Sequence, residues 1–184
     1  MDIIESKLKG CMIIEPTIYY DERGFFYESY QQEKYKKIGI KEIFIQDNRS
    51  RSSKNVLRGL HFQKQYPQGK LVTVTMGKVL DIAVDLRPNS PTFGEYESVI
   101  LTDENKLQFY VPPGFAHGFC VLSDIADFAY KCTDYYVPTD ECGIRWDDPT
   151  IGIKWPIDNP VLSEKDLKQP FLKDIEKCII NGWK

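Results

Sequence analysis

Two histidines, His61 and His117, are the most informative residues in this sequence, because proton transfer near neutral pH commonly uses an imidazole. His61 lies in the segment VLRGLHFQ, close to Arg58, and Lys70 follows shortly afterwards in QGKL. A neutral imidazole can remove a proton, and a nearby cation can stabilise the negative charge that results. A histidine alone in a strand is more often an ordinary hydrogen-bonded side chain. The combination of Arg58, His61 and Lys70 is what indicates a reaction site.

A glycine in the same segment bears on whether these side chains can meet. Arg58 and His61 have opposite parity, so a regular strand would point them to opposite faces of its sheet. Gly59 within a strand pattern predicts a bulge, which would direct both side chains into one cavity.

Three further segments carry residue types suited to binding or catalysis. Tyr130, in FAYKCTDYY, is either a filler of the barrel interior or, beside a polar pocket, a proton donor. The segments Asp21–Phe26 (DERGFF) and Gln46–Arg51 (QDNRSR) are either solvated loops or sources of arginine for binding phosphate. Ser163 and Asp166 match a helix capping box, a structural role that requires no activity.

The scarcity of ligands disfavours metal-dependent chemistry. An open-sided metal site in a barrel of this kind takes about three histidines and a carboxylate, and this chain has 2 histidines. His61 is followed by Phe62 and Gln63 instead of a second imidazole. The 5 cysteines are scattered without a Cys-x-x-Cys pair, so we expect reduced, mostly buried thiols and neither disulfides nor a structural zinc site.

Short strands separated by turns are expected to position these residues. In Lys78–Arg87 (KVLDIAVDLR) a large apolar residue stands at every second position from Leu80 to Leu86. This period of two predicts a strand with one face toward the core. Clusters of Gly, Pro, Asn and Asp separate such runs, which favours a β-barrel with peripheral helices over a βαβ fold. Helical patterns are confined to Ser29–Lys37 and to a segment that begins near Ser163 and is interrupted around Pro170. Similar strands are predicted at Lys70–Met76, Tyr96–Leu101, Leu107–Val111, Gly118–Leu122 and Asp127–Thr133.

Length and charge limit the class of protein. The 184 residues suit one domain, residues 1–184, which is large enough to bury a sizeable core. The 24 Lys and Arg against 27 Asp and Glu give a net charge of −3, which argues against a nucleic-acid partner. No apolar run approaches the roughly 20 residues of a membrane span, and the start, MDIIESKLKG, does not match a signal peptide. We expect a cytoplasmic protein that binds neither nucleic acid nor membrane.

Several longer motifs resemble those of one enzyme family. In chain order they are DERGFFYES, QDNRS, VLRGLHFQ with QGKLV, VPPGFAHGF, YKCTDYYVP, GIRWDDP and LSEKD. Their order, from about Ile13 to about Asp166, is similar to that of the dTDP-4-dehydrorhamnose 3,5-epimerase family. The resemblance implies an all-β fold, a metal-free, cupin-like jelly-roll β-barrel (double-stranded β-helix) with short peripheral helices. The barrel core would span about residues 40–137 and a peripheral helical segment about residues 163–180. A homodimer whose N-terminal segments cross between subunits, and the absence of any cofactor, are implied as well.

The resemblance also implies a reaction, the inversion of C3′ and C5′ of a 4-keto-6-deoxyglucose carried on dTDP. Both carbons neighbour the C4′ ketone, so a base can remove either proton to give an enolate, which is then protonated from the opposite face. In this comparison His61 would be the base and Asp166 the carboxylate that orients it. Lys70 would stabilise the enolate, and Tyr130 would be the acid. The positions that match binding residues for nucleotide, diphosphate or sugar are Arg23, Glu28, Gln46, Asp47, Asn48, Arg58, His117, Glu141 and Lys165.

Two aromatic residues and several other activities remain open on the sequence. Phe26 and Tyr136 could offer flat surfaces to the pyrimidine or the sugar, and ordinary packing explains them equally well. One alternative activity is a 3-epimerase, or a related isomerase, of another nucleotide-linked 4-keto sugar. A sugar-binding jelly roll without catalysis would leave the combination of His61, Lys70 and Tyr130 unexplained. A metal-dependent dioxygenase is the most distant alternative.

Overall fold

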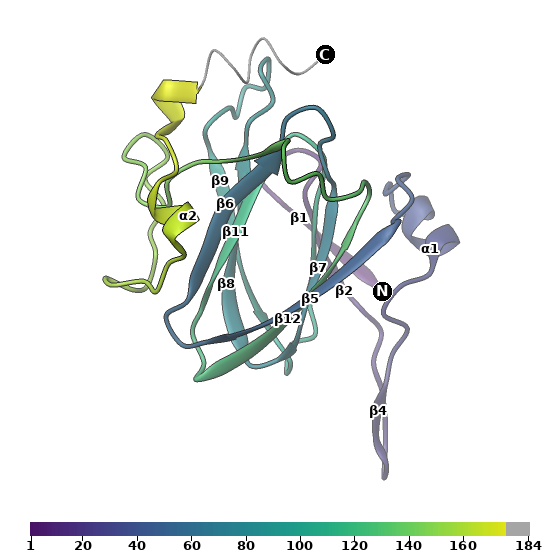
Figure 1. Cartoon of the computed structure of the whole chain (residues 1–184). Helices are drawn as coiled ribbons and strands as arrows, with labels where there is room; N and C mark the ends of the chain where they lie inside the picture. Colours follow the sequence, from purple (N-terminus) through teal and green to yellow (C-terminus); the bar gives the residue numbers. More distant parts are fainter. Residues whose placement is uncertain (176–184) are drawn as a thin grey trace.

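The computed structural model describes residues 1–175, and most of its strands form two antiparallel sheets that wrap around one core (Figure 1). One sheet has the order β1 (Asp2–Glu5), β2 (Met12–Glu15), β10 (Gln108–Val111), β7 (Lys70–Met76), β12 (Ile125–Cys132), β5 (Gln46–Ser53). The other has the order β13 (Glu141–Gly143), β6 (Leu57–Gln63), β11 (Phe115–Val121), β8 (Lys78–Asp85), β9 (Tyr96–Thr102). A separate hairpin consists of β3 (Tyr19–Asp21) and β4 (Gly24–Phe26).

The pairing of the strands defines the architecture. From β5 to β12 the chain pairs first with last: β5 with β12, β6 with β11, β7 with β10 and β8 with β9. This nested antiparallel pairing is the double-stranded β-helix of a jelly roll. The predicted all-β jelly-roll barrel is therefore confirmed.

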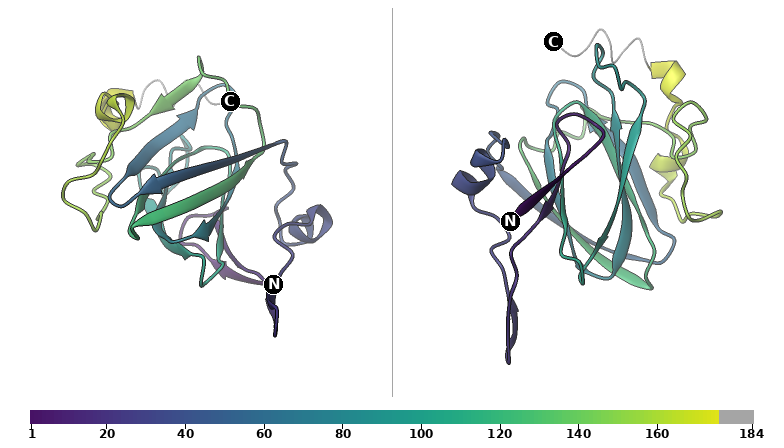
Figure 2. Two further views of the ribbon diagram at one scale, coloured as in Figure 1. Left: turned by 60° about the horizontal axis from the view of Figure 1, so that its bottom comes forward. Right: turned by 180° about the vertical axis from the view of Figure 1, so that it is seen from behind.

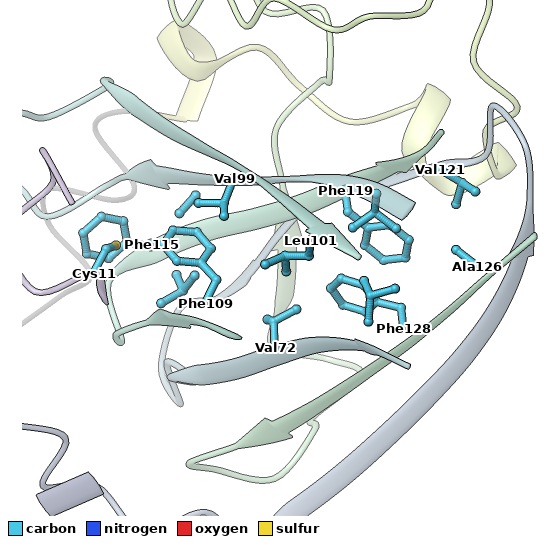
Figure 3. Close-up of a cluster of buried hydrophobic side chains, with 14 of the residues drawn as sticks. Cys11, Val72, Val99, Leu101, Phe109, Phe115, Phe119, Val121, Ala126 and Phe128 are labelled. Carbon is cyan, nitrogen blue, oxygen red and sulfur yellow. The ribbon is translucent and has the colours of Figure 1, made fainter. Parts of the chain in front are cut away.

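Apolar side chains from both sheets fill much of the barrel (Figure 3). Phe119 of β11 and Phe128 of β12 stack with ring centroids 3.9 Å apart, and Leu101 and Phe109 are fully buried. Burying one side chain of this size stabilises a fold by roughly 1.5–3 kcal/mol. This packing makes the barrel a rigid support for the polar residues that share its interior.

Strand β8 differs from the prediction, because both of its faces are buried. Val79 and Ala83 point into the barrel, whereas Leu80 and Ile82 pack outward against a second cluster that includes Ile144 and other residues after β13. The expectation of a single core-facing side was wrong because the C-terminal part of the chain covers the outer face of this sheet. Asp81 and Asp85 share the parity of Val79 and Ala83 on the barrel side of the strand, and neither has any exposed surface.

The helices are short and peripheral, as predicted. Helix α1 (Gln32–Lys37) begins after Gln31, whose side chain accepts a hydrogen bond from the Lys34 amide at 2.6 Å. Helix α2 (Glu164–Leu167) begins after Ser163, and the backbone becomes helical again at residues 172–175. The predicted interruption near Pro170 is confirmed, and the part of the predicted segment beyond residue 175 lies outside the described residues. No helix among residues 1–175 is both long and apolar enough to cross a membrane.

The hairpin β3–β4 projects away from the barrel (Figures 1 and 2). Its aromatic side chains are largely exposed, with Tyr20 and Phe26 each 69% exposed. Gly24 at the turn has a φ of +127°, a conformation that favours glycine, so the sequence supports this tight turn locally. The exposed aromatic rings of this hairpin are therefore not accounted for by packing within the chain itself.

Candidate active site

A cavity of about 570 Å³ opens inside the barrel, and its lining gathers most of the predicted site residues from distant parts of the sequence. Strands β5, β6, β7, β11 and β12 contribute, together with β13 and the start of α2. The predicted residues that line it are Gln46, Asn48, Arg58, His61, Lys70, His117, Tyr130, Tyr136, Glu141, Lys165 and Asp166.

An irregularity in β6 brings Arg58 and His61 to the same cavity, as predicted from Gly59. The pairing between β6 and β11 shifts register at this point. Gly59 has a φ of +126°, and a Cβ atom there would lie 2.6 Å from the Cα of Gly118 on β11. Only glycine allows the two strands to approach so closely. This local break in the strand's alternation therefore lets Arg58 and His61, which have opposite parity, face the same cavity.

His61 and Asp166 form a hydrogen-bonded pair at the edge of the cavity. His61 Nε2 lies 2.5 Å from Asp166 Oδ1, and the aspartate side chain is 4% exposed. Ser163 also serves this carboxylate: its Oγ donates to Asp166 Oδ2 at 2.8 Å and accepts from the Asp166 amide at 3.1 Å. Burial alone would raise the pKa of Asp166, but the hydrogen bonds from His61 and Ser163 outweigh it and hold the pKa below its usual value. Asp166 thus takes part in the capping box and orients the imidazole at the same time.

The other ring nitrogen of His61 is available for chemistry. His61 Nδ1 lies 4.0 Å from Glu141 Oε1, and its side chain is 28% exposed. Glu141 is itself held by Tyr136, which donates from its hydroxyl at 2.5 Å, and by an ion pair with Lys165. Burial would raise the pKa of Glu141, but the bonds to Lys165 and Tyr136 lower it overall. The carboxylate is therefore anionic and lies close to the free ring nitrogen of His61.

Lys70 places a cation in the cavity wall at the start of β7. Burial lowers the pKa of its ammonium, and the nearby Cys132, Asp81 and Glu141 act in the opposite direction. Within residues 1–175 the ammonium has neither a hydrogen bond nor a carboxylate close enough for an ion pair. A cation in this position is free to stabilise a negative charge on a bound molecule.

Tyr130 supplies a phenol to the same cavity from β12. Burial raises its pKa, with a smaller contribution from Cys132, while Arg58 opposes the shift. A phenol with a raised pKa stays protonated at neutral pH, so Tyr130 can donate a proton.

Four predicted residues lie away from the cavity in this chain. Arg23 is on the projecting hairpin and binds Asp21, and Glu28 forms an ion pair with Lys34 at 2.8 Å. Asp47 of β5 points outward to Lys131 at 2.9 Å, because alternate residues of a strand face opposite sides and Gln46 and Asn48 face inward. The fourth residue, exposed on the hairpin, is Phe26.

Comparison with known proteins identifies the family. A sequence profile described as dTDP-4-dehydrorhamnose 3,5-epimerase matches residues 5–174. The dTDP-4-dehydrorhamnose 3,5-epimerase of Shigella flexneri is 51% identical over 181 residues, which is 97% of this chain and 100% of that protein. The enzyme of the same name from Escherichia coli is 53% identical over 169 residues, 90% of this chain and 91% of that protein. This chain belongs to the dTDP-4-dehydrorhamnose 3,5-epimerase family.

Solved structures agree with this membership. The dTDP-6-deoxy-D-glucose-3,5-epimerase of Legionella pneumophila, in complex with dTDP-4-keto-L-rhamnose, is 55% identical with a TM-score of 0.94 and covers 97% of this chain and 96% of its own. ChmJ of Streptomyces bikiniensis, a 3′-monoepimerase in complex with dTDP-quinovose, is 32% identical with a TM-score of 0.88 and covers 95% and 90%. The family fold therefore carries more than one pattern of epimerisation.

Asp81 and Ser50 are among the polar residues of this family member's site that were not predicted from the sequence. Asp81 accepts a hydrogen bond from His117, and its charge in the middle of the apolar run of β8 was the available signal. Ser50 lines the cavity with a buried hydroxyl that has no partner among residues 1–175. Its inward position could have been inferred from its parity with Gln46 and Asn48. Within the described chain, no group of three or more His, Cys, Asp or Glu side chains is arranged to hold a metal ion.

Proposed function

We propose that the protein inverts C3′ and C5′ of dTDP-4-dehydro-6-deoxy-D-glucose to give dTDP-4-dehydro-L-rhamnose, a step of dTDP-L-rhamnose biosynthesis. Membership of the epimerase family supports this assignment. The observation that carries it is the meeting of the His61–Asp166 pair, Lys70 and Tyr130 in one cavity. These residues supply a base, a cation and an acid, which are the parts that enolate chemistry requires.

The proposed mechanism follows from the free groups of the cavity. His61 Nε2 is bonded to Asp166, so Nδ1 is the atom that takes the proton from the carbon next to the ketone. The electron pair of that C–H bond moves onto the C4′ oxygen, where the Lys70 ammonium stabilises it. Tyr130 then delivers its proton to the opposite face of the carbon, which inverts it. The cycle leaves a protonated His61 and a deprotonated Tyr130, and proton exchange between them through water restores both.

This reaction transfers protons and no net electrons, so we propose that it needs no redox cofactor. Lys70 takes the place that a metal ion would have in polarising the ketone, and a metal-independent enzyme is proposed on that basis. The cytoplasm, where nucleotide sugars would be available as substrates, is the proposed location.

The nucleotide is proposed to bind where polar groups lie without partners. Arg58 donates from Nε to Ser52 at 3.1 Å, and its terminal nitrogens have no hydrogen-bond partner among the described residues. A guanidinium with a free planar edge can bind a diphosphate through two charge-assisted hydrogen bonds. Tyr136, 48% exposed at the cavity, offers a flat surface to the pyrimidine.

A homodimer is proposed to complete the site. Arg23, Phe26 and Glu28 lie on or beside a hairpin that projects from its own barrel, which a second copy could receive against its cavity (Figure 1). The test mixes two inactive variants, Arg23→Ala and His61→Asn, after unfolding and refolding them together. If each hairpin serves the partner's cavity, a mixed dimer contains one intact site and activity returns. Absence of recovery in mixed dimers of demonstrated composition would contradict this arrangement.

The experiment that tests the proposed function is NMR of dTDP-4-keto-6-deoxyglucose with the protein in heavy water. Deuterium entering both C3′ and C5′ supports the proposal. Entry at C3′ alone would instead support the activity of a 3-epimerase, which the similarity to ChmJ makes a specific alternative. Binding without exchange, even in long incubations, would indicate a jelly roll that binds the sugar without catalysis.

A further inference from the structure

A second cavity, of about 1030 Å³, is formed by loops that connect the strands at one end of the barrel, and it is called the loop cavity below. Its walls come from the turn between β1 and β2 and from the connections β6–β7, β8–β9 and β10–β11. No described residue lines both this cavity and the one that contains His61 and Lys70. Gln63 lines the active-site cavity and the next residue, Lys64, lines the loop cavity, so the two spaces lie on different sides of the chain at the end of β6.

All the charged side chains that line the loop cavity, among the described residues, are positive. The cations are those of Lys7, Lys9, Lys64 and Arg87, and neither an aspartate nor a glutamate is part of this lining. The whole chain has a net charge of −3, so the positive charge here is a local concentration that runs against the overall balance. A concave surface lined by one sign of charge attracts molecules of the opposite sign.

The three lysines of the loop cavity are available to an anion. Within residues 1–175 the ammonium groups of Lys9 and Lys64 have neither a hydrogen bond nor an ion pair. The ammonium of Lys7 lies over the ring of Tyr96, 5.1 Å from its centroid, and has no carboxylate partner in that part of the chain. An ammonium without a partner can donate charge-assisted hydrogen bonds to a bound anion.

The two carboxylates that approach the loop cavity hold its backbone. Glu97 accepts a hydrogen bond from the Lys7 amide at 3.1 Å, and Asp140 accepts from the amides of Gln65 and Tyr66, each at 2.9 Å. Neither carboxylate forms an ion pair with a lysine of the cavity among the described residues. They reduce the positive potential of the lining, and the lysines keep their hydrogen-bonding capacity.

The walls of the loop cavity are held in place before any ligand arrives. Arg87 donates to Asp85 from Nε at 2.8 Å and from Nη2 at 2.7 Å, and its Nη1 donates to the Lys9 carbonyl at 2.9 Å. This guanidinium therefore ties the β8–β9 connection to the turn that contains Lys9. Prolines, which restrict the backbone, are distributed over three of the loops: Pro67, Pro88, Pro91 and Pro113. A preformed site loses less conformational entropy when a ligand binds.

We propose that the loop cavity binds a chain of phosphates, whether free polyphosphate or the polyphosphate of a nucleotide. Its free cations come from two different loops, so they suit a ligand whose negative charges are spread along a chain. The cavity volume is at the upper end of the range of about 300–1,000 Å³ for small-molecule sites, which is far more space than a single phosphate fills. This site is separate from the proposed epimerase reaction and does not depend on it.

The test is an NMR titration of the ¹⁵N-labelled protein with tripolyphosphate and, separately, with ATP. The protein is first saturated with dTDP, so that the active-site cavity is occupied and cannot take the added phosphates. We expect the backbone amide signals of Lys64, Gln65, Asn89 and Ser90 to shift in both titrations. The affinity should fall as the salt concentration rises, because the contacts are between charges.

Two double variants with the same change of charge locate the binding. Lys9→Gln with Lys64→Gln should weaken tripolyphosphate binding by about tenfold or more, because two charge-assisted contacts are lost. Lys36→Gln with Lys37→Gln is the matched control, since both lysines are exposed on α1 and line neither cavity. The control should bind tripolyphosphate with the affinity of the wild-type protein, and both double variants should unfold at a similar temperature.

Each outcome decides the inference. Equal affinity for tripolyphosphate and ATP supports a site for the phosphate chain alone, and tighter binding of ATP supports a nucleotide whose base also contacts the wall. The inference is overturned if the four amide signals do not shift, or if both double variants lose affinity equally, which indicates unspecific attraction to positive charge. Failure of dTDP to bind would contradict the proposed function instead, and the tripolyphosphate titration would still decide the loop cavity.

Discussion

Replacing Asp166 by asparagine should separate catalysis from structure at one hydrogen bond. The His61–Asp166 bond is 2.5 Å long, and its acceptor is a buried carboxylate. A hydrogen bond to a charged group contributes about 1.5–3 kcal/mol, which corresponds to a rate loss of roughly ten- to hundredfold if the imidazolium loses it in the transition state. The loss would be larger where the new amide donates to Nε2, because the ring proton then occupies Nδ1 and blocks the base.

The assay is the initial rate at which deuterium enters dTDP-4-keto-6-deoxyglucose in heavy water, measured by NMR. Ser163→Ala is the matched control, since it weakens the same capping box by about 1 kcal/mol but keeps the carboxylate on His61. Asp166→Asn should lose far more rate than Ser163→Ala at a similar unfolding temperature. A wild-type rate in Asp166→Asn, or an equal loss in both variants, would refute the role assigned to the carboxylate.

Three further predictions concern the cation, the core and acid stability. Lys70→Met should lower the exchange rate by about 10²–10³-fold without lowering the unfolding temperature, because it removes a half-buried cation that has no close partner in the described chain; a small rate change would contradict its role. Leu101→Ala should cost about 2–5 kcal/mol in urea unfolding while the folded fraction keeps its activity, because Leu101 is fully buried away from the cavity. Hydrogen bonds from Arg51 and Arg49 hold the pKa of Asp127 well below its usual value, so its contribution to stability is present above about pH 4 and is lost as the pH falls further. Asp127→Asn should therefore flatten the acid-induced fall in unfolding temperature, and an unchanged profile would contradict this reason.

Parts of the site could be predicted because they depend on local pattern. Gly59 signalled the break in alternation that lets Arg58 and His61 share a cavity, and the strand periodicity indicated a barrel. The two roles of Asp166, which the sequence left as competing interpretations, are compatible because Ser163 and His61 bond the carboxylate at different oxygens.

Other parts depend on tertiary context that no local pattern contains. Asp81 breaks an apolar run, but its partner His117 lies on another strand, and only the pairing of β8 with β11 brings them together. Burial of both faces of β8 depends on where the C-terminal part of the chain folds back. In the proposed dimer, Arg23 would reach the cavity of a second copy of the chain. Its distance from the reacting carbon then depends on how two chains assemble, which local sequence patterns do not reveal.

The most direct test of the central claim is the stereochemical outcome of exchange in His61→Asn and Tyr130→Phe. If the imidazole removes the proton and the phenol returns one on the opposite face, His61→Asn should show neither deuterium entry nor inversion. Tyr130→Phe should admit deuterium from solvent at the reacting carbon while leaving its configuration unchanged, because the base alone can return deuterium to the face it took from. Continued inversion in Tyr130→Phe, or rapid exchange in His61→Asn, would contradict the assignment of base and acid.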